Sequence, residues 1–259
     1  MRQDAAAGED GVEAGEDEYR RARALDEAGE TAEAEALYRA AAGAGHVRAM
    51  NVLGLSHVER DKDEAERWWL KAADAGFAPA MRNLGYLADE RSRPDEAERW
   101  WRAAGEAGDA TAAYNLGFML ARQRRTEEAA TFYTIAAESG DTEAMVNLSS
   151  VLEALDRADE AESWLLRAAG KGDPVAMSNL GASCYKARRV DEAERWWRRG
   201  AEAGGRDAAY NLAVLLDGRG ATDEAVRHFE AAAEAGHPKA RRQLDEIRTQ
   251  GAARIAGIF

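Results

Sequence analysis

Apolar residues recur at helical spacing in two successive stretches of about thirteen residues, and the pair of stretches then repeats along the chain. In one clear copy, the apolar side of the first stretch is formed by Met81, Leu84, Leu87 and Ala88. The second stretch has its apolar side at Ala97, Trp100, Trp101 and Ala104. Each copy therefore predicts a hairpin of two amphipathic helices, here called the first and second helix of a repeat.

Glycines at the ends of the second helices define the length of the repeat. They are spaced by 32 residues and lie at Gly76, Gly108, Gly140, Gly172, Gly204 and Gly236. The step from Gly45 to Gly76 is 31, and the missing residue falls between Gly54 and Asp63, in a turn. Each glycine is expected to supply the left-handed residue that stops the helix. Acidic pairs such as Asp95 with Glu98 have capping-box spacing at the starts of the second helices.

These repeats predict an all-α fold, a right-handed α-solenoid of about seven helical hairpins with a C-terminal capping helix. The expected domains are an acidic, disordered arm at 1–17, a helical-repeat solenoid at 18–250 and a short tail at 251–259. The arm is rich in glycine, alanine and acidic residues, so it has little to bury. The segment from Pro238 to Arg248 aligns with a first helix but has Asp245 at the position of a contact glycine, as expected of a cap.

One combination of residues resembles the Sel-one-like branch of the tetratricopeptide-type repeats. It consists of Ala80, Asn83, Leu84 and Gly85, then Ala97, Trp100, Trp101 and Ala104, then Gly108. The resemblance extends over roughly Tyr19 to Arg248. It implies a solenoid whose first helices line a concave surface, and a role in assembling or binding other proteins.

A column of asparagines stands out on the first helices. Its members are 32 residues apart, at Asn83, Asn115, Asn147, Asn179 and Asn211, whereas the earlier repeat has Val52 there and Asn51 one place before. An amide both donates and accepts, so a row of amides on a concave wall can pair with the backbone of an extended peptide. Alternatively, each amide bridges neighbouring hairpins. The two roles are compatible.

Aromatic and cationic residues are expected on the same concave wall as the amides. Such residues are typical of peptide grooves, because rings give a large contact area at low entropic cost and arginine favours carboxylates. The candidates are Arg82, Tyr86, Tyr114, Phe118, Arg122, Tyr185, Lys186 and Tyr210. Some of the rings are alternatively fillers of the seam between hairpins.

All 7 tryptophans lie in second helices, at Trp68, Trp69, Trp100, Trp101, Trp164, Trp196 and Trp197. Other repeats carry Phe132, Tyr133, Leu165 and Phe229 at these positions, so bulk is the shared property. This favours packing in the core and between repeats over a ligand box.

The sequence contains no arrangement typical of catalysis or of metal and cofactor binding. The 4 histidines have no metal-ligand spacing, and phosphate loops, nucleophile elbows and zinc-binding helices are missing. The acidic pairs lie at helix starts, where the helix dipole explains them. The single cysteine, Cys184, has no second cysteine with which to form a disulfide or thiolate site. We therefore expect no enzyme activity, no cofactor and no metal.

Net charge and hydropathy restrict the partners. A formal net charge of −13 disfavours nucleic acid and anionic lipid, and no apolar run is long enough for a membrane span or a secretory signal. The expected protein is a cytoplasmic monomer or weak homo-oligomer that holds a protein or peptide on its concave face. The alternative is a regulatory or self-associating subunit that acts through its ends or through the tail at Ile258 and Phe259.

Overall fold

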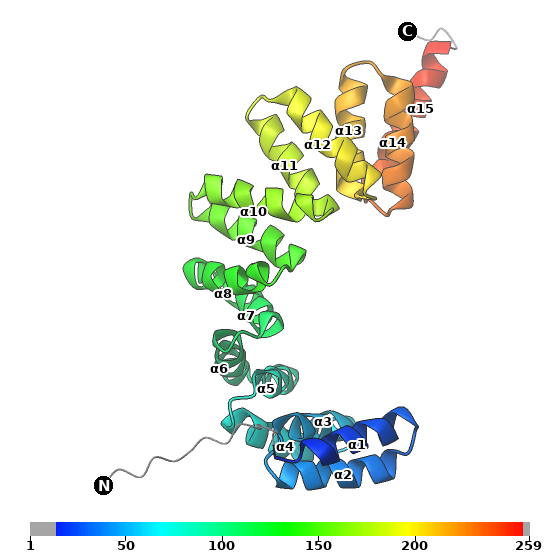
Figure 1. The fold of residues 1–259 in the computed structure, drawn as a ribbon. Coiled ribbons are helices and arrows are strands. Elements are labelled where there is room, and N and C mark those ends of the chain that lie inside the picture. Colours follow the sequence, from blue (N-terminus) through cyan, green and yellow to red (C-terminus); the bar gives the residue numbers. More distant parts are fainter. Residues whose placement is uncertain (1–13, 256–259) are drawn as a thin grey trace. The chain divides into compact units, whose positions relative to one another are not determined.

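A computed structural model describes residues 14–255, with side chains described for residues 14–249. Within this range all regular secondary structure is α-helical (Figure 1). The helices are α1 (Glu16–Glu27), α2 (Thr31–Gly43), α3 (Val47–His57), α4 (Lys62–Asp74), α5 (Ala78–Glu90), α6 (Pro94–Glu106), α7 (Ala110–Arg122), α8 (Thr126–Glu138), α9 (Thr142–Ala154), α10 (Ala158–Gly170), α11 (Pro174–Lys186), α12 (Val190–Glu202), α13 (Arg206–Gly218), α14 (Thr222–Glu234) and α15 (Ala240–Ile255).

The helices are arranged as the sequence predicted. In the described residues, six pairs of consecutive helices pack as hairpins, and α15 is a single helix packed on α14. The hairpins are α1–α2, α3–α4, α5–α6, α9–α10, α11–α12 and α13–α14. The fold is therefore an all-α helical-repeat solenoid, which confirms the predicted class. The odd-numbered helices are the first helices of the repeats and the even-numbered helices are the second.

The chain divides into two compact units, Met1–Met119 and Leu120–Phe259, and each is described by itself. Unit 1 contains α1 to α6 and most of α7. Unit 2 contains the end of α7 and all the helices that follow.

Both ends of the solenoid extend beyond the predicted limits. Helix α1 begins at Glu16, inside the expected arm, and α15 continues to Ile255, inside the expected tail. The Glu16 carboxylate lies 2.9 Å from Nε2 of His46, which ties the start of α1 to the start of α3. The remainder of the arm, residues 1–13, and the last residues of the tail, 256–259, lie outside the described range.

Left-handed residues end the second helices, as predicted. Gly76 has a φ of 82°; its N–H donates to the carbonyl of Ala73, and the next N–H, from Phe77, donates to Ala72. The corresponding glycines at 45, 108, 140, 172, 204 and 236 also have positive φ. The short repeat is explained by α3, which has 11 residues where α5 has 13, so the missing residue lies at the α3–α4 junction.

The predicted capping boxes are wrong, because the second helices begin before the acidic pairs. Helix α6 starts at Pro94, so Asp95 and Glu98 already lie inside it, and the residue at its N-cap, Arg93, makes no side-chain cap bond. The same displacement occurs in α10 and α12. Acidic side chains of the first turn pair with arginine instead: Arg157, before α10, donates two bonds of 2.7 Å to Glu160. The acids still face the positive end of the helix dipole, so that part of the interpretation holds.

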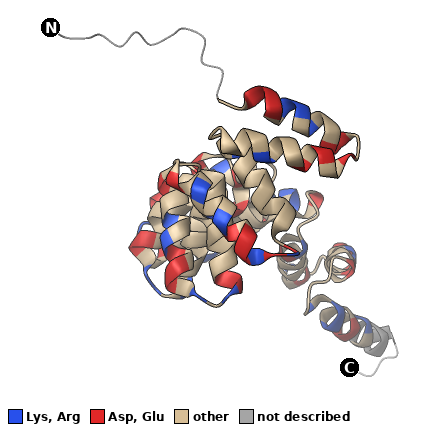
Figure 2. Cartoon of the chain, turned by 90° about the horizontal axis from the view of Figure 1, so that it is seen from below, with Lys and Arg blue, Asp and Glu red and all other residues tan. Residues whose placement is uncertain are grey.

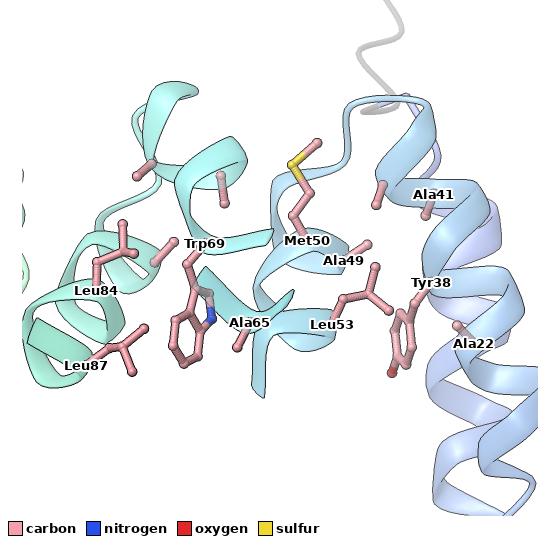
Figure 3. Packing of buried hydrophobic residues seen from close by; sticks show 14 of the residues in the cluster. Ala22, Tyr38, Ala41, Ala49, Met50, Leu53, Ala65, Trp69, Leu84 and Leu87 are labelled. Carbon is pink, nitrogen blue, oxygen red and sulfur yellow. The ribbon is translucent and has the colours of Figure 1, made fainter. Parts of the chain in front are cut away.

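In the core of three hairpins, a tryptophan of the second helix packs against a glycine of the first helix. Figure 3 shows Trp69 between α3 and α5, with Leu53 and Ala65 on one side and Leu84 and Leu87 on the other. An added Cβ at Gly54 would lie 2.2 Å from the Trp69 indole, and one at Gly85 would lie 2.3 Å from that of Trp101. In two other repeats the tryptophan is replaced by a smaller residue and the glycine by a larger one. These pairs are Leu165 with Ser149 and Phe229 with Ala213.

The tryptophans have the packing role that the sequence indicated. The second member of each pair, such as Trp69, Trp101 and Trp197, is buried, whereas the first is half-buried. A cation covers the half-buried ring: Lys71 Nζ lies 4.2 Å from the ring centre of Trp68, and the Arg167 guanidinium lies 4.0 Å from that of Trp164. Acidic and basic residues are interspersed over the helices (Figure 2).

Candidate functional site

The asparagine column lies on consecutive odd-numbered helices, from Asn83 on α5 to Asn211 on α13. All five side chains are half-buried. The sequence prediction that they share one face of successive first helices is consistent with this placement. Their hydrogen bonds differ between the two units.

In unit 1 the amides are used inside the protein. The Asn83 amide donates to Oδ1 of Asn51 over 2.9 Å, and the Asn115 amide donates to the Tyr86 hydroxyl over 2.8 Å. Asn51 was left out of the predicted column because alignment on the 31-residue step placed Val52 there. Its distance of 32 residues from Asn83 was the signal for its role. These amides join α3, α5 and α7 to one another.

In unit 2 two amides are available. Among the described residues, neither Asn179 nor Asn211 has a hydrogen-bond partner for its side chain, whereas Asn147 is engaged. A half-buried amide without a protein partner can bind a ligand at little desolvation cost. The part of the column that is suited to binding therefore lies on α11 and α13.

Arg82 and Tyr210, which were predicted to lie on the binding wall, contact the next repeat. The Arg82 guanidinium donates to Asp109 over 2.8 Å. The Tyr210 ring stacks on His237 with centroids 4.0 Å apart, and the Tyr19 ring stacks on His46 in the same way at 4.4 Å. In each of these pairs the partners are 27 residues apart. A cation with an acid, or a tyrosine with a histidine, at this separation therefore indicates a contact between successive repeats.

Other predicted wall residues are open to solvent. Tyr86, Phe118 and Tyr185 are 44%, 49% and 49% exposed. Arg122 and Lys186 are also exposed, whereas Tyr114 is half-buried; Arg122, Tyr114 and Phe118 all have contacts within the protein. Tyr86 lies edge-on to Trp101 with centroids 5.7 Å apart.

A pocket of about 430 Å³ lies in unit 2 between α11, α12 and α13, and we call it the α11–α13 pocket. It brings together three predicted site residues, Tyr185, Lys186 and Asn211. The sequence analysis did not assign its other lining residues to a site; they are Ala182, Trp197, Val214, Leu215, Gly218 and Arg219. The nearly buried Trp197 is held by a 3.1 Å bond from its indole N–H to the Ser178 carbonyl, and the Tyr185 ring lies 5.7 Å from it.

The two cations of the pocket differ in how they are paired. Arg219 binds Asp191 and Glu194 on α12, and Glu194 also accepts from Arg198. Hydrogen bonds from Arg198 and then Arg219 lower the pKa of the Glu194 carboxyl, so this network stays ionised. Lys186 forms no ion pair with any described residue. Its ammonium is the cation that the pocket offers to a ligand.

A pocket of about 420 Å³ occupies the corresponding place in the first repeats of unit 1, between α1, α2 and α3. Its lining is more polar and includes Asp26, Glu35, Tyr38 and Ser56. Burial, followed by the charge of Asp26, raises the pKa of the Tyr38 hydroxyl, so this group is a neutral hydrogen-bonding group at physiological pH. The same position in the fold therefore presents different chemistry in the two units.

Reactive side chains do not converge in either pocket. Within the described range, no group of three or more His, Cys, Asp or Glu side chains has the arrangement of a metal site. Cys184 is buried, and burial raises the pKa of its thiol, so it is a poor nucleophile at neutral pH. None of the helices in residues 14–255 combines the length and apolarity needed to cross a membrane.

Comparison with known proteins agrees with the repeat architecture. A tetratricopeptide-repeat sequence profile matches residues 78–103 and 207–231. No curated protein sequence matches the chain.

Solved structures give matches of greater extent. A protective antigen of uropathogenic Escherichia coli with an SLR fold is 26% identical, with a TM-score of 0.76 over 90% of this chain and 56% of its own. A Sel1 repeat protein from Oxalobacter formigenes is also 26% identical, with a TM-score of 0.64 over 89% of this chain and 75% of its own. PilF of Pseudomonas aeruginosa, at 20% identity and a TM-score of 0.57 over 79% of this chain and 97% of its own, shares the fold. The chain thus spans little more than half the length of the first of these structures.

These matches and the observed hairpins define the class. Two segments of the chain match the tetratricopeptide-repeat profile, and its helical-repeat fold is similar to those of the SLR and Sel1 repeat proteins. Folds of this class support protein–protein interaction and are typically non-catalytic.

Proposed function

We propose that this protein is a non-catalytic, cytoplasmic scaffold or adaptor that binds a segment of a partner protein along its odd-numbered helices. The observation that carries the proposal is the α11–α13 pocket, which is lined by the unpaired amide of Asn211. The second unpaired amide, Asn179, lies on α11, the helix that contributes Tyr185 and Lys186 to the pocket. An extended segment carries a backbone donor and acceptor at every residue, and amide side chains satisfy both. The partner's side chains then enter the pocket.

The two parts of the asparagine column provide a test with an internal control. Asn179→Ala with Asn211→Ala should reduce capture of proteins from the native source, measured by quantitative mass spectrometry after affinity purification. Its thermal melting curve should stay close to that of the wild type, since neither amide is bonded within the described protein. Asn83→Ala removes a bond between helices, so it should lower Tm.

Three observations contradict the proposal. The first is a set of captured proteins that is the same for wild type and for the Asn179→Ala, Asn211→Ala variant. The second is a collapse of the fold in that variant, which would show that both amides are structural. The third is a chemical turnover catalysed by the purified chain.

The alternative function is a regulatory or self-associating subunit that acts through its ends or through the tail at Ile258 and Phe259, and these two residues lie outside the described range. Light scattering on the full chain and on a chain ending at Gly251 tests it. A strictly monomeric full chain excludes self-association.

A further inference from the structure

We infer that the α11–α13 pocket is an anchor site for a large apolar side chain of a protein segment that carries a carboxylate next to that side chain. The inference rests on the proposed function and specifies which segments the surface selects. It is carried by the apolar lining, the unpaired cation at Lys186 and a corresponding pocket of different chemistry in unit 1.

The interior of the pocket suits an aromatic or branched aliphatic side chain. Trp197 and Leu215 line it, and Val214 and Tyr185 remain 47% and 49% exposed without an occupant. Its volume of about 430 Å³ lies in the range of sites that enclose a ligand group. An apolar occupant would remove these exposed side chains from water, and this is the main source of affinity in such anchors.

The polar side chains of the pocket determine which charge the bound segment carries next to its apolar anchor residue. Lys186 has no ion pair with a described residue, whereas Arg219 is already neutralised by Asp191 and Glu194. The two carboxylates that face Arg219 are therefore already paired, and Lys186 is the lining cation left for the carboxylate of a ligand. In a chain with a net charge of −13, such a local cation is what allows an acidic segment to bind here. Asn211, also on the lining, can pair with the segment's backbone.

The unit 1 pocket shows that this chemistry is not a general property of the repeat. Positions 159 residues earlier in the chain replace Tyr185 by Asp26, Lys186 by Glu27, Asn211 by Val52 and Leu215 by Ser56. The same place in the hairpin thus loses the Tyr185 ring, the free cation and the amide, and it has Tyr38 in place of Trp197. A segment with an apolar anchor and a carboxylate should bind at α11–α13 and not at α1–α3.

Two synthetic peptides test the inference on the full chain. Both are acetylated and amidated Gly-Ser peptides; one has a central Asp-Phe-Asp and the other a central Lys-Phe-Lys. Methyl-labelled protein is titrated with each at low salt, and the signals of Val214 and Leu215 are followed by NMR. We expect the acidic peptide to shift these signals and to bind about fivefold more tightly than the basic one, the effect of one partly screened ion pair.

Variants identify the source of the preference. Lys186→Gln should abolish the preference for the acidic peptide, whereas Lys239→Gln, at another exposed lysine of unit 2, should not. Val214→Glu should block both peptides. Val175→Glu, at a valine of similar exposure on α11, should leave binding intact. Higher salt should reduce the acid preference more than the total binding.

The outcomes separate this inference from the proposed function. Equal affinity for both peptides, the absence of shifts at Val214 and Leu215 at millimolar peptide, or binding at α1–α3 instead would overturn the inference. None of these results decides the proposed function, which is tested by the capture experiment. If the acidic peptide binds as expected but Asn179→Ala with Asn211→Ala captures every wild-type partner, the proposed function fails and the pocket assignment stands.

Discussion

Individual glycines set the distance between the two helices of a repeat. Gly85 lies so close to Trp101 that no Cβ fits between them without movement of the ring. Alanine and phenylalanine, at Ala213 and Phe229, occupy the corresponding positions of another repeat, where both are buried. The residue of the first helix and the residue of the second helix therefore fill the same space between the helices. A larger residue at one of these positions requires a smaller residue at the other.

Gly85→Ala should destabilise the protein by about 1–3 kcal/mol, because overpacking exceeds the gain in helix propensity of roughly 1 kcal/mol. Adding Trp101→Phe should recover most of the loss, as it restores the volume and removes an indole N–H that is buried without a described partner. Urea unfolding measures both variants. The control is Gly43→Ala, at a helical glycine with open space around it, which should not destabilise. A neutral Gly85→Ala variant would refute the packing argument.

At the scale of the helix, the contacts between successive repeats use side-chain pairs that vary in chemistry at a fixed place. Stacked rings, as in Tyr210 on His237, and an ion pair, as in Arg82 with Asp109, perform the same task. In the C-terminal helices, the pH dependence of stability is expected to involve His228 and His237. Burial is the main cause that lowers the pKa of both His228 and His237, although acidic neighbours oppose it.

The sign of the resulting pH dependence follows from these lowered pKa values. Unfolded histidine titrates near 6.5, so the unfolded state binds more protons than the folded state below that pH. The contribution of the two histidines is complete above pH 6.5 and is lost as the pH falls toward their folded pKa values. Carboxylates such as Glu194, whose lowered pKa starts from 4.5, contribute only in a more acidic window.

Acidification from pH 7.5 to 5.5 should therefore lower Tm, and His228→Gln with His237→Gln should make that decrease smaller. Thermal melting of wild type and variant at both pH values measures the difference. The same decrease in both proteins would exclude these two histidines as its source.

At the scale of the molecule, helices within each unit contact mainly their neighbours in sequence, so stability is expected to be local. Helix α15 covers α14 with Ala240 and Leu244, both buried. A chain that ends at His237 should lose about 2–4 kcal/mol from the adjacent hairpin, because buried apolar groups such as Phe229 lose their cover.

Hydrogen exchange should locate that loss. Protection of α13 and α14 should fall in the shortened chain, whereas protection of α1 to α4 should be unchanged. A chain that ends at Gln250 retains the described buried contacts of α15, at Ala240 and Leu244, and serves as the control. A uniform loss of protection over all helices would show that the repeats unfold as one cooperative body.

The amino-acid sequence by itself determined the period, the hairpins and the class of fold. These follow from local signals that repeat: apolar spacing, a glycine in the left-handed conformation and bulky residues at fixed positions. It also predicted the asparagine column and three of the residues that meet in the α11–α13 pocket, since each lies at a regular position of its helix.

The tertiary structure decided which members of the column are already bonded and which are available. Asn83 and Asn211 are equivalent in sequence, yet of these two only Asn83 meets another amide among the described residues, that of Asn51. Asn51 lies one place before the column, since its carbonyl accepts from Trp69 as the Ser178 carbonyl accepts from Trp197. Likewise, Lys186 and Arg219 are both cations, and only their neighbours on α12 distinguish the paired one from the unpaired one. Whether a hydrogen bond or ion pair forms between repeats depends on differences of a few tenths of an ångström in the distance between two side chains that are far apart in the sequence. A periodic pattern does not encode such differences.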